Sequence, residues 1–332
     1  MGDYSCAPSW SCPSGHQERH AVETRSHAVC ARQDIPNRLY TPDSMPSESD
    51  PVLTAYPAGF HEDDALRSTF MRHLMLTASA ADSTPDAELR PAATCTIPRV
   101  LIRFWDAQIP ADVQACLDTW ESLRADGFDL LTFTDATAAA YIEETFGPRQ
   151  LAAFDRCHHP AMRSDYFRLC YVLASGGFYV DADDVLTLGQ WPLLYQDDRL
   201  KVQPLGYDIS STLMVDSAEL WQAGPNDADR IFYVNNTPLV APPGHPVVRA
   251  ALLRATQALL SGRHLHDIQA VTGPGNLTAT LAAHARDLAL AGKAPDFELM
   301  RSWNRIAETR WHLSYRADQR NWRLLPRAGQ EG

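Results

Sequence analysis

Residues 161–184 read AMRSDYFRLCYVLASGGFYVDADD, and they carry the clearest structural pattern of the chain. Its first half has a helical period, because apolar residues recur at positions i, i+3, i+4 and i+7 from Tyr166 to Leu173. Ser175-Gly176-Gly177 then ends the helix with residues that tolerate positive φ. Phe178–Val180 follows as a short apolar run. The stretch therefore predicts a helix, a tight turn and a short buried strand that ends in carboxylates.

Four charged residues of this stretch are candidates for a binding site. Asp165 and Arg168 lie three residues apart, so they are neighbours on the surface of the predicted helix. Asp181 and Asp183 are two apart after the strand, and alternation puts them on the same side. Ligands of open α/β sheets bind at the carboxyl ends of the strands. Two carboxylates there suit a hard cation such as Mg²⁺ or Mn²⁺; the alternative is that they cap the strand and face water.

The block MRSDYFRLCYVLASGGFYVDAD (162–183) resembles the signature of the DXD-containing sugar transferases of glycosyltransferase family 32. The large glucosylating toxins are more distant relatives. Further matches occur in the same order: IPRVLIRFWD (97–106), DTWESL (118–123), NTPLVAPPGHPVV (236–248) and TGPGNLT (272–278). Over roughly residues 96–320, the resemblance implies an α/β fold: a GT-A-like single Rossmann-type domain with a mostly parallel sheet and additional C-terminal helices.

The resemblance also implies an activity. The expected enzyme is a metal-dependent hexosyltransferase that moves a sugar from a nucleotide-diphospho-sugar to an acceptor hydroxyl with retention. Mn²⁺ or Mg²⁺ is expected on Asp181 and Asp183, where it would stabilise the charge developing on the leaving diphosphate. Arg168, a third catalytic candidate, and Asp165 are expected to hold hydroxyls of the donor sugar. Asp181 counts among the donor contacts as well as the metal ligands.

Three further positions are predicted to contact the donor. Trp105 ends a predicted strand; by resemblance it stacks on the nucleotide base, although a buried strand-end Trp is the alternative. Asn236 matches a family position. Gly273 precedes a helix expected to begin near Asn276, and a helix N-terminus can receive phosphate, although an ordinary capped turn fits equally well. Arg103 is a departure, because many relatives have His there.

The segment RSWNRIAETRWHLSYRADQRNWR (301–323) is rich in Arg and Trp. In the relatives this region carries a Ser-Trp motif that closes over the donor and contributes to the metal shell. Ser314-Tyr315 is the nearest match, so we expect Tyr315 at the donor and Ser314, with His312, at the metal. Tyr in place of Trp is a second departure from the family. Arg310 and Arg316 either neutralise the leaving diphosphate or are solvated surface charges.

Composition excludes some classes of partner. The net charge of −12 over 332 residues argues against nucleic acid or an anionic membrane. No apolar run approaches the roughly 18 residues of a spanning helix, and the N-terminus lacks the pattern of a secretion signal. The seven cysteines have irregular spacing, which favours reduced thiols. We therefore expect a cytoplasmic enzyme. Its acceptor (a glycan, a protein or a small metabolite) stays open.

Three segments are predicted along the chain. Residues 1–58 are expected to form a flexible tail, because much of this part is polar and rich in Pro and Ser. Residues 59–95 read as a helical segment, centred on 60–78, and a linker. Residues 96–325 form the expected GT-A-like domain, because β and α patterns alternate there. Its predicted early elements are strands at Val100–Trp105 and Asp129–Phe133, a helix at Asp112–Ala125, and a helix capped by Thr134 or Asp135 that runs to Phe146.

Two other functions compete with this interpretation. VDADDVLTL (180–188) also fits the haloacid-dehalogenase phosphatase pattern, in which the first Asp is a nucleophile. Such an enzyme needs a downstream Lys, and only Lys201 and Lys293 are available. The second alternative is a non-catalytic binder of sugar nucleotides, although nothing in the motif is broken.

Overall fold

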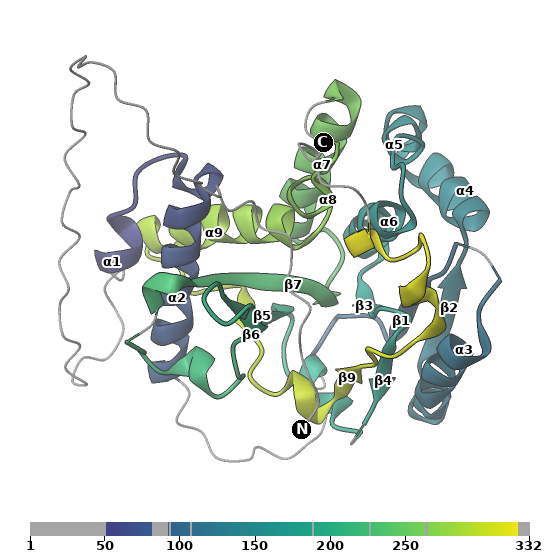
Figure 1. Cartoon of the computed structure of the whole chain (residues 1–332), viewed down its shortest axis with the longest axis horizontal. Helices are drawn as coiled ribbons and strands as arrows, with labels where there is room; N and C mark the ends of the chain where they lie inside the picture. Colours follow the sequence, from purple (N-terminus) through teal and green to yellow (C-terminus); the bar gives the residue numbers. More distant parts are fainter. Residues whose placement is uncertain are drawn as a thin grey trace, which may run out of the picture.

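The computed structural model describes residues 51–81, 92, 94–106, 108–187, 189–225, 227–262 and 265–324. Within them, a seven-stranded sheet has the order β2-β1-β3-β7-β5-β6, and β8 pairs with β5 (Figure 1). A separate two-stranded sheet joins β4 and β9. The strands are β1 (Val100–Phe104), β2 (Asp129–Phe133), β3 (Gly177–Tyr179), β4 (Asp184–Leu186), β5 (Leu200–Asp208), β6 (Leu213–Met214), β7 (Arg230–Ala241), β8 (Phe297–Leu299) and β9 (Ala307–Thr309).

Strand direction divides the large sheet into two halves. β2, β1 and β3 are parallel to one another, whereas β7 is antiparallel to both of its neighbours, β3 and β5. β6 is antiparallel to β5, and β8 is parallel to it. Five of the seven described strands therefore run in one direction, and β6 and β7 run against them. The expected α/β architecture is confirmed. The antiparallel pairing around β7 was not predicted by the alternation of β and α patterns along the sequence.

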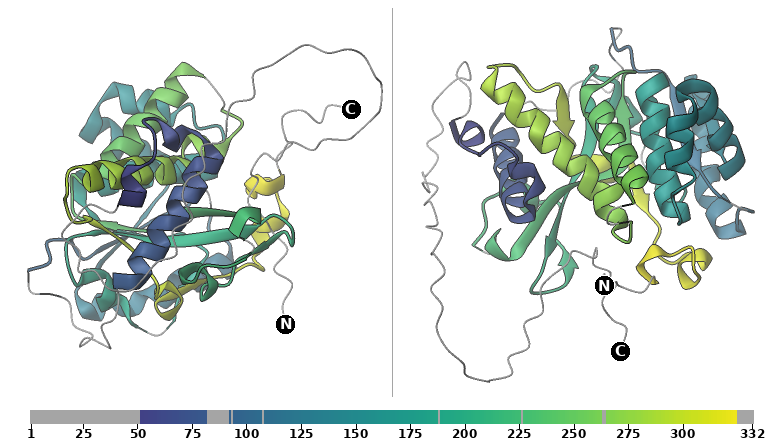
Figure 2. Two further views of the ribbon diagram at one scale, coloured as in Figure 1. Left: turned by 90° about the vertical axis from the view of Figure 1, so that its left-hand side faces the viewer. Right: turned by 90° about the horizontal axis from the view of Figure 1, so that it is seen from above.

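Helices cover the sheet on one side (Figures 1 and 2). This layer contains α4 (Asp135–Phe146), α5 (Pro148–Phe154), α6 (Pro160–Ser175), α7 (Pro246–Ser261), the short α8 (Ile268–Val271) and α9 (Pro274–Leu290). Near the N-terminus, α1 (Pro51–Thr54) and α2 (Asp64–Ala81) contact α9, and α2 also packs on β7. On the other side, α3 (Ala111–Asp118) and the 3₁₀ stretch after it contact β4, and the 3₁₀ stretch also contacts β2. None of the described helices combines the length and apolarity needed to cross a bilayer.

The chain at β3 contributes side chains to the hydrophobic cores on both faces of the sheet, because successive side chains alternate. Tyr179 points into the core beneath the helices, whereas Phe178 and Val180 join the core on the opposite face, around Trp120. All three are fully buried. Because β3 lies between β1 and β7 near the middle of the sheet, the chain that leaves it emerges in the interior of the molecule. The carboxylates after β3 are thereby held at the centre of the fold.

Most of the predicted local elements are present, with shifted ends. The strand Asp129–Phe133 has its predicted bounds, and Thr134 caps α4 by accepting a hydrogen bond from the Thr137 N–H. The helix expected over 112–125 divides into α3 and a 3₁₀ stretch, Thr119–Asp126. Residues 60–78 form a 3₁₀ turn, Phe60–Glu62, and most of α2. Much of the predicted N-terminal tail, residues 1–50, lies outside the described residues.

Candidate active site

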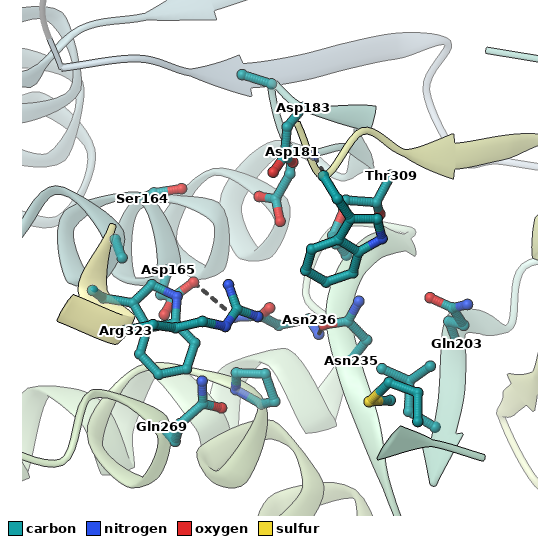
Figure 3. Close-up of a pocket in the computed structure, with 18 of the residues that line it drawn as sticks. Ser164, Asp165, Asp181, Asp183, Gln203, Asn235, Asn236, Gln269, Thr309 and Arg323 are labelled. Carbon is teal, nitrogen blue, oxygen red and sulfur yellow. Dashed lines mark hydrogen bonds between the residues drawn. The ribbon is translucent and has the colours of Figure 1, made fainter. Parts of the chain in front are cut away.

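The carboxyl ends of β1 and β3 open onto a cavity of about 770 Å³. Its other walls come from α6, from β5 and β7, and from the C-terminal segment, by which we mean residues 308–323. Figure 3 shows the side chains of Asp165, Asp181, Asp183 and Asn236 around this opening. Seven of the predicted site residues line the cavity: Trp105, Asp165, Arg168, Asp181, Asp183, Asn236 and Tyr315.

A buried ion pair from α6 forms one wall. The Arg168 guanidinium lies 3.0 Å from Asp165 Oδ1 and 2.8 Å from Asp181 Oδ1. It also donates to the Asn236 carbonyl at 2.8 Å and stacks over the Tyr179 ring at 4.2 Å. The sequence predicted Asp165 and Arg168 as neighbours on the helix surface; they are neighbours, but both are buried. They are buried because α6 packs its Arg168 face against β3 and β7 and not against water.

An irregularity between β5 and β7 forms the opposite wall. Val202 pairs with Leu239 and Pro204 with Val234, so Gln203 alone faces the four residues 235–238 of β7. Such bulges re-aim side chains and are frequent beside active sites. Here the extra length turns Asn236 toward α6, where its Nδ2 donates to Asp165 Oδ1 at 2.8 Å. The bulge thereby ties the antiparallel half of the sheet to the ion pair of α6.

Thr237, also in the bulge, fixes the loop that carries the DXD aspartates. Its hydroxyl accepts the Asp181 N–H at 3.1 Å and donates to Asp184 Oδ2 at 3.2 Å. Asp184 is fully buried and also accepts a hydrogen bond from the Thr309 hydroxyl on β9 at 2.6 Å. Asp183 turns toward the C-terminal segment, where its Oδ2 accepts from the Tyr315 hydroxyl at 2.6 Å and pairs with Arg316. Each carboxylate of the loop therefore has its own set of partners.

The acidic residues of the site raise one another's pKa. Burial raises the pKa of Asp181, and Asp183 raises it further, against the opposing effect of Arg168. Burial also lifts the pKa of Asp184 well above its ordinary value, with Asp183 and Asp181 adding to the rise. The pKa of Asp165 rises to about 6, again because of burial. Like charges crowded in this way are relieved by a nearby cation.

Asp181 and Asp183 fit a divalent cation by their chemistry. Both carboxylates line the cavity, and Asp183 already pairs with a cationic group, the guanidinium of Arg316. Within the described ranges, no three Asp, Glu, His or Cys side chains converge as a metal cluster. The protein would thus supply few ligands and leave the remaining positions to water and phosphate, which is how Mg²⁺ is usually bound.

Aromatic rings cover the part of the cavity near β1. The Tyr315 ring meets Trp105 edge-on, with centroids 5.3 Å apart, and the Arg320 guanidinium lies 5.7 Å from the Trp105 ring. Trp105 is largely buried, and its indole N–H donates to the Gln108 carbonyl at 3.3 Å. Trp311 adds a third ring to the lining. The C-terminal segment therefore contributes aromatic rings to the wall of the cavity.

Three predicted residues do not line the cavity: Gly273, His312 and Ser314. The Ser314 hydroxyl donates to Asp112 Oδ1 at 2.9 Å, so a metal role would require this bond to break. His312 is exposed. Gly273 caps α9, and a Cβ there would lie 3.2 Å from Asp165 Oδ2. Gly273 therefore allows this turn to approach the ion pair of α6.

The residues that sequence reasoning missed include Gln203, Asn235 and Thr237 in the lining of the cavity, and Asp184 beside it. Asp184 directly follows the DXD motif, but its burial depends on Thr237 and on Thr309 of β9, more than 50 and 120 residues away. Asn235 and Thr237 flank Asn236, and only the bulge exposes them to the cavity. The Asn-Asn-Thr-Pro run was the available signal, because polar residues interrupt an otherwise apolar strand there.

The lysine that the phosphatase alternative requires does not line the cavity. Lys201 is fully buried and pairs with Asp197 and, at 3.5 Å, with Glu298. Lys293 is exposed after α9. Neither belongs to the described lining of the cavity. The geometry therefore gives Asp181 an arginine partner, Arg168, and no lysine.

Comparisons with known proteins agree with the motif. Residues 110–199 match the family model described as "Glycosyltransferase sugar-binding region containing DXD motif". The initiation-specific alpha-1,6-mannosyltransferase of Saccharomyces cerevisiae is 22% identical over 194 residues, covering 50% of this chain and 40% of that enzyme. The chain thus spans less than half of this relative's length. Among solved structures, the PaToxG glycosyltransferase superposes with a TM-score of 0.39 at 12% identity, covering 79% of this chain and 95% of that one. The resemblance to DXD-containing glycosyltransferases is confirmed.

Proposed function

We propose that this chain is a glycosyltransferase that moves a sugar from a nucleotide-diphospho-sugar to an acceptor hydroxyl and depends on a divalent cation. One observation carries the proposal. Asp181 and Asp183 line the same cavity as the Asp165–Arg168 pair, at the carboxyl end of β3. A diphosphate and two carboxylates repel one another, and a cation between them removes that repulsion. The match to the DXD sugar-binding family supports the same chemistry.

The donor sugar is proposed to bind between α6 and the bulge of β7. Arg168 donates and Asp165 accepts, so together they can satisfy sugar hydroxyls, which do both. Asn236 holds Asp165 in place through its amide at 2.8 Å. The nucleotide base is proposed to lie against Trp105, at the end of β1. The diphosphate then spans the distance from Trp105 to the DXD loop.

In the proposed reaction, the bond between C1 of the sugar and the diphosphate oxygen breaks as a bond from the acceptor oxygen to C1 forms. The electron pair leaves with the nucleoside diphosphate, and the acceptor proton passes to a diphosphate oxygen or to solvent. A bound Mn²⁺ or Mg²⁺ supplies Lewis-acid stabilisation of the leaving charge. We propose retention of configuration. Asp165 already pairs with Arg168 and Asn236, which supports a reaction without a protein nucleophile.

The acceptor is proposed to approach along the wall of β5 and β7. This wall presents two half-buried amides, Gln203 and Asn235, beside the apolar Met214 and Val215. The Gln203 amide makes no hydrogen bond to another described residue, so it is available to a ligand. Amides both donate and accept, which matches a hydroxyl-bearing acceptor.

The test measures release of nucleoside diphosphate from UDP-, GDP- and TDP-sugars, with Mn²⁺ or with EDTA. We expect turnover of one donor that needs the metal. Asp183→Asn should lower this turnover by about a hundredfold or more, because a charge that acts on the leaving group is lost. The fold should persist, because Asp183 is partly exposed at the cavity.

Asp155→Asn is the matched control, because Asp155 is an exposed aspartate at the end of α5, away from the cavity lining. It should turn over like the wild type. Turnover that persists in EDTA, or in Asp183→Asn at the wild-type rate, would overturn the proposed role of the DXD aspartates.

A further inference from the structure

Arg316 reaches Asp183 from the C-terminal segment. Its guanidinium pairs with Asp183 Oδ2, the same oxygen that accepts the Tyr315 hydroxyl. The two partners of this pair are 133 residues apart in the chain. Arg316 also lies over the Trp311 ring at 4.6 Å. In the described structure, the proposed metal ligand is thus neutralised by a side chain of the protein itself.

Arg316 and a cation compete for Oδ2 of Asp183. This oxygen already accepts from Arg316 and from the Tyr315 hydroxyl, so a cation that binds it must displace a donor. When a cation takes Oδ2 of Asp183, Arg316 loses its anion and becomes a partly buried charge in need of another. A charge left unpaired in such a place is costly. The fold must therefore offer Arg316 a second anion for the loaded state to be stable.

A second observation points to that anion. The Arg316 Nε is buried and has no hydrogen-bond acceptor among the described residues. The fork of a guanidinium presents Nε and a terminal nitrogen in parallel, the geometry that binds two oxygens of a phosphate. In the present arrangement only one branch of the fork is used for Asp183. Arg316 therefore has an unused donor while it lines the cavity.

The diphosphate of a bound donor would be the matching anion. Arg316 lies next to Asp183 and Tyr315, and Tyr315 contacts Trp105, against which the base is proposed to lie. The diphosphate of a donor would pass between these two ends, within the neighbourhood of Arg316. Trp311 packs against the flat face of the guanidinium, so hydrogen bonds from Arg316 are made through its edge. A stacked arginine can turn its edge from a carboxylate to a phosphate with little rearrangement.

We infer that Arg316 exchanges partners during donor binding: it neutralises Asp183 in the free protein and binds the donor diphosphate once Asp183 has taken the cation. The inference rests on the proposed function. It assigns Arg316 to the binding of the leaving group, and it makes the free protein resist a cation that arrives without nucleotide.

The exchange predicts two changes of opposite sign in one variant. Arg316→Gln removes the competitor, so Mn²⁺ alone should bind about fivefold more tightly, the size expected of a partly exposed ion pair. The same variant loses a phosphate contact, so UDP or GDP should bind about tenfold or more weakly at saturating Mn²⁺. Arg316→Lys keeps the charge but not the fork and should fall between the wild type and Arg316→Gln in both measurements.

The experiment is isothermal titration of the purified chain, first with Mn²⁺ alone and then with UDP and GDP at saturating Mn²⁺. Arg310→Gln is the matched control: Arg310 is a nearby exposed arginine that pairs with Glu308, and its backbone N–H, which donates to the Asp183 carbonyl, survives the substitution. It should match the wild type in both titrations. Circular dichroism of each variant verifies that it is folded.

Opposite shifts in Arg316→Gln support the exchange. Shifts in the same direction, or the absence of a shift in one or both titrations, overturn the exchange. The proposed function then still stands, provided that the wild type binds a nucleotide in a metal-dependent way. If the wild type binds neither Mn²⁺ nor a nucleotide, the proposed function fails and the exchange fails with it.

Discussion

Helix α6 and the C-terminal segment each bring an arginine to an aspartate of the same cavity, but the two ion pairs are built differently. Arg168 and Asp165 are three residues apart on one helix, and their side chains are 3% and 9% exposed. Arg168 is further held by Asp181 and by the Asn236 carbonyl. Arg316 comes from a segment of short 3₁₀ turns and leaves its Nε unpaired among the described residues. The first pair is therefore held on several sides, whereas the second is the pair that we propose to exchange partners.

Breaking the first pair should have the larger effect. Arg168→Met leaves Asp165 and Asp181 without their shared counterion inside the protein. Removing one partner of a buried pair costs about 3–5 kcal/mol, so the free energy of unfolding should fall by that amount. Urea denaturation, followed by circular dichroism, measures it.

Arg310→Met is the control that measures how much unfolding free energy is lost with a surface arginine, since Arg310 is 57% exposed. Its effect should stay within about 0.5 kcal/mol. If Arg168→Met were as stable as Arg310→Met, the buried pair would not stabilise the fold, and the contrast between the two ion pairs would disappear.

The free energy of unfolding should depend on pH through Asp165, a member of the ion pair on α6. Burial raises the pKa of this carboxyl from 3.8 to about 6, although Arg168 acts in the other direction. The folded state therefore holds the proton more tightly than the unfolded chain. Its contribution to stability is fully present below pH 4 and is lost as the pH rises toward and through 6. The linked change amounts to at most about 3 kcal/mol.

Asp165→Asn removes this titration. The difference in unfolding free energy between the wild type and Asp165→Asn, measured by urea denaturation from pH 4 to pH 7, should move against the wild type as the pH rises. Groups that titrate in both proteins, such as Asp184, largely cancel in this difference. A difference that stays constant over the whole range would show that Asp165 keeps an ordinary pKa in the fold.

The sequence was sufficient where the decisive contacts are local. The spacing of Asp165 and Arg168, the Gly176-Gly177 turn and the carboxylates after β3 all lie within 20 residues, so their periodicity predicts their arrangement. The predicted strand at Asp129–Phe133 has the observed bounds for the same reason. The helical and extended periods of apolar residues are properties of short stretches of chain, so they can be read without knowing the tertiary contacts.

The sequence was insufficient where partners are distant. The bulge that exposes Asn235 exists only because β5 and β7 pair out of step around Gln203, and a single strand does not reveal its register. Ser314 was expected at the metal, yet it bonds to Asp112, 202 residues away. The burial of Arg168 likewise depends on β7. Each of these outcomes is decided by tertiary packing, which local patterns do not encode.

Metal-dependent binding of the donor is tested by a thermal-unfolding series of the wild-type chain with UDP-, GDP- and TDP-sugars, each with and without Mn²⁺. One donor should stabilise the protein only when the metal is present, by about 2.7 kcal/mol at a donor concentration a hundred times its Kd. Equal stabilisation with and without Mn²⁺, or no stabilisation by any of these donors, would contradict this prediction.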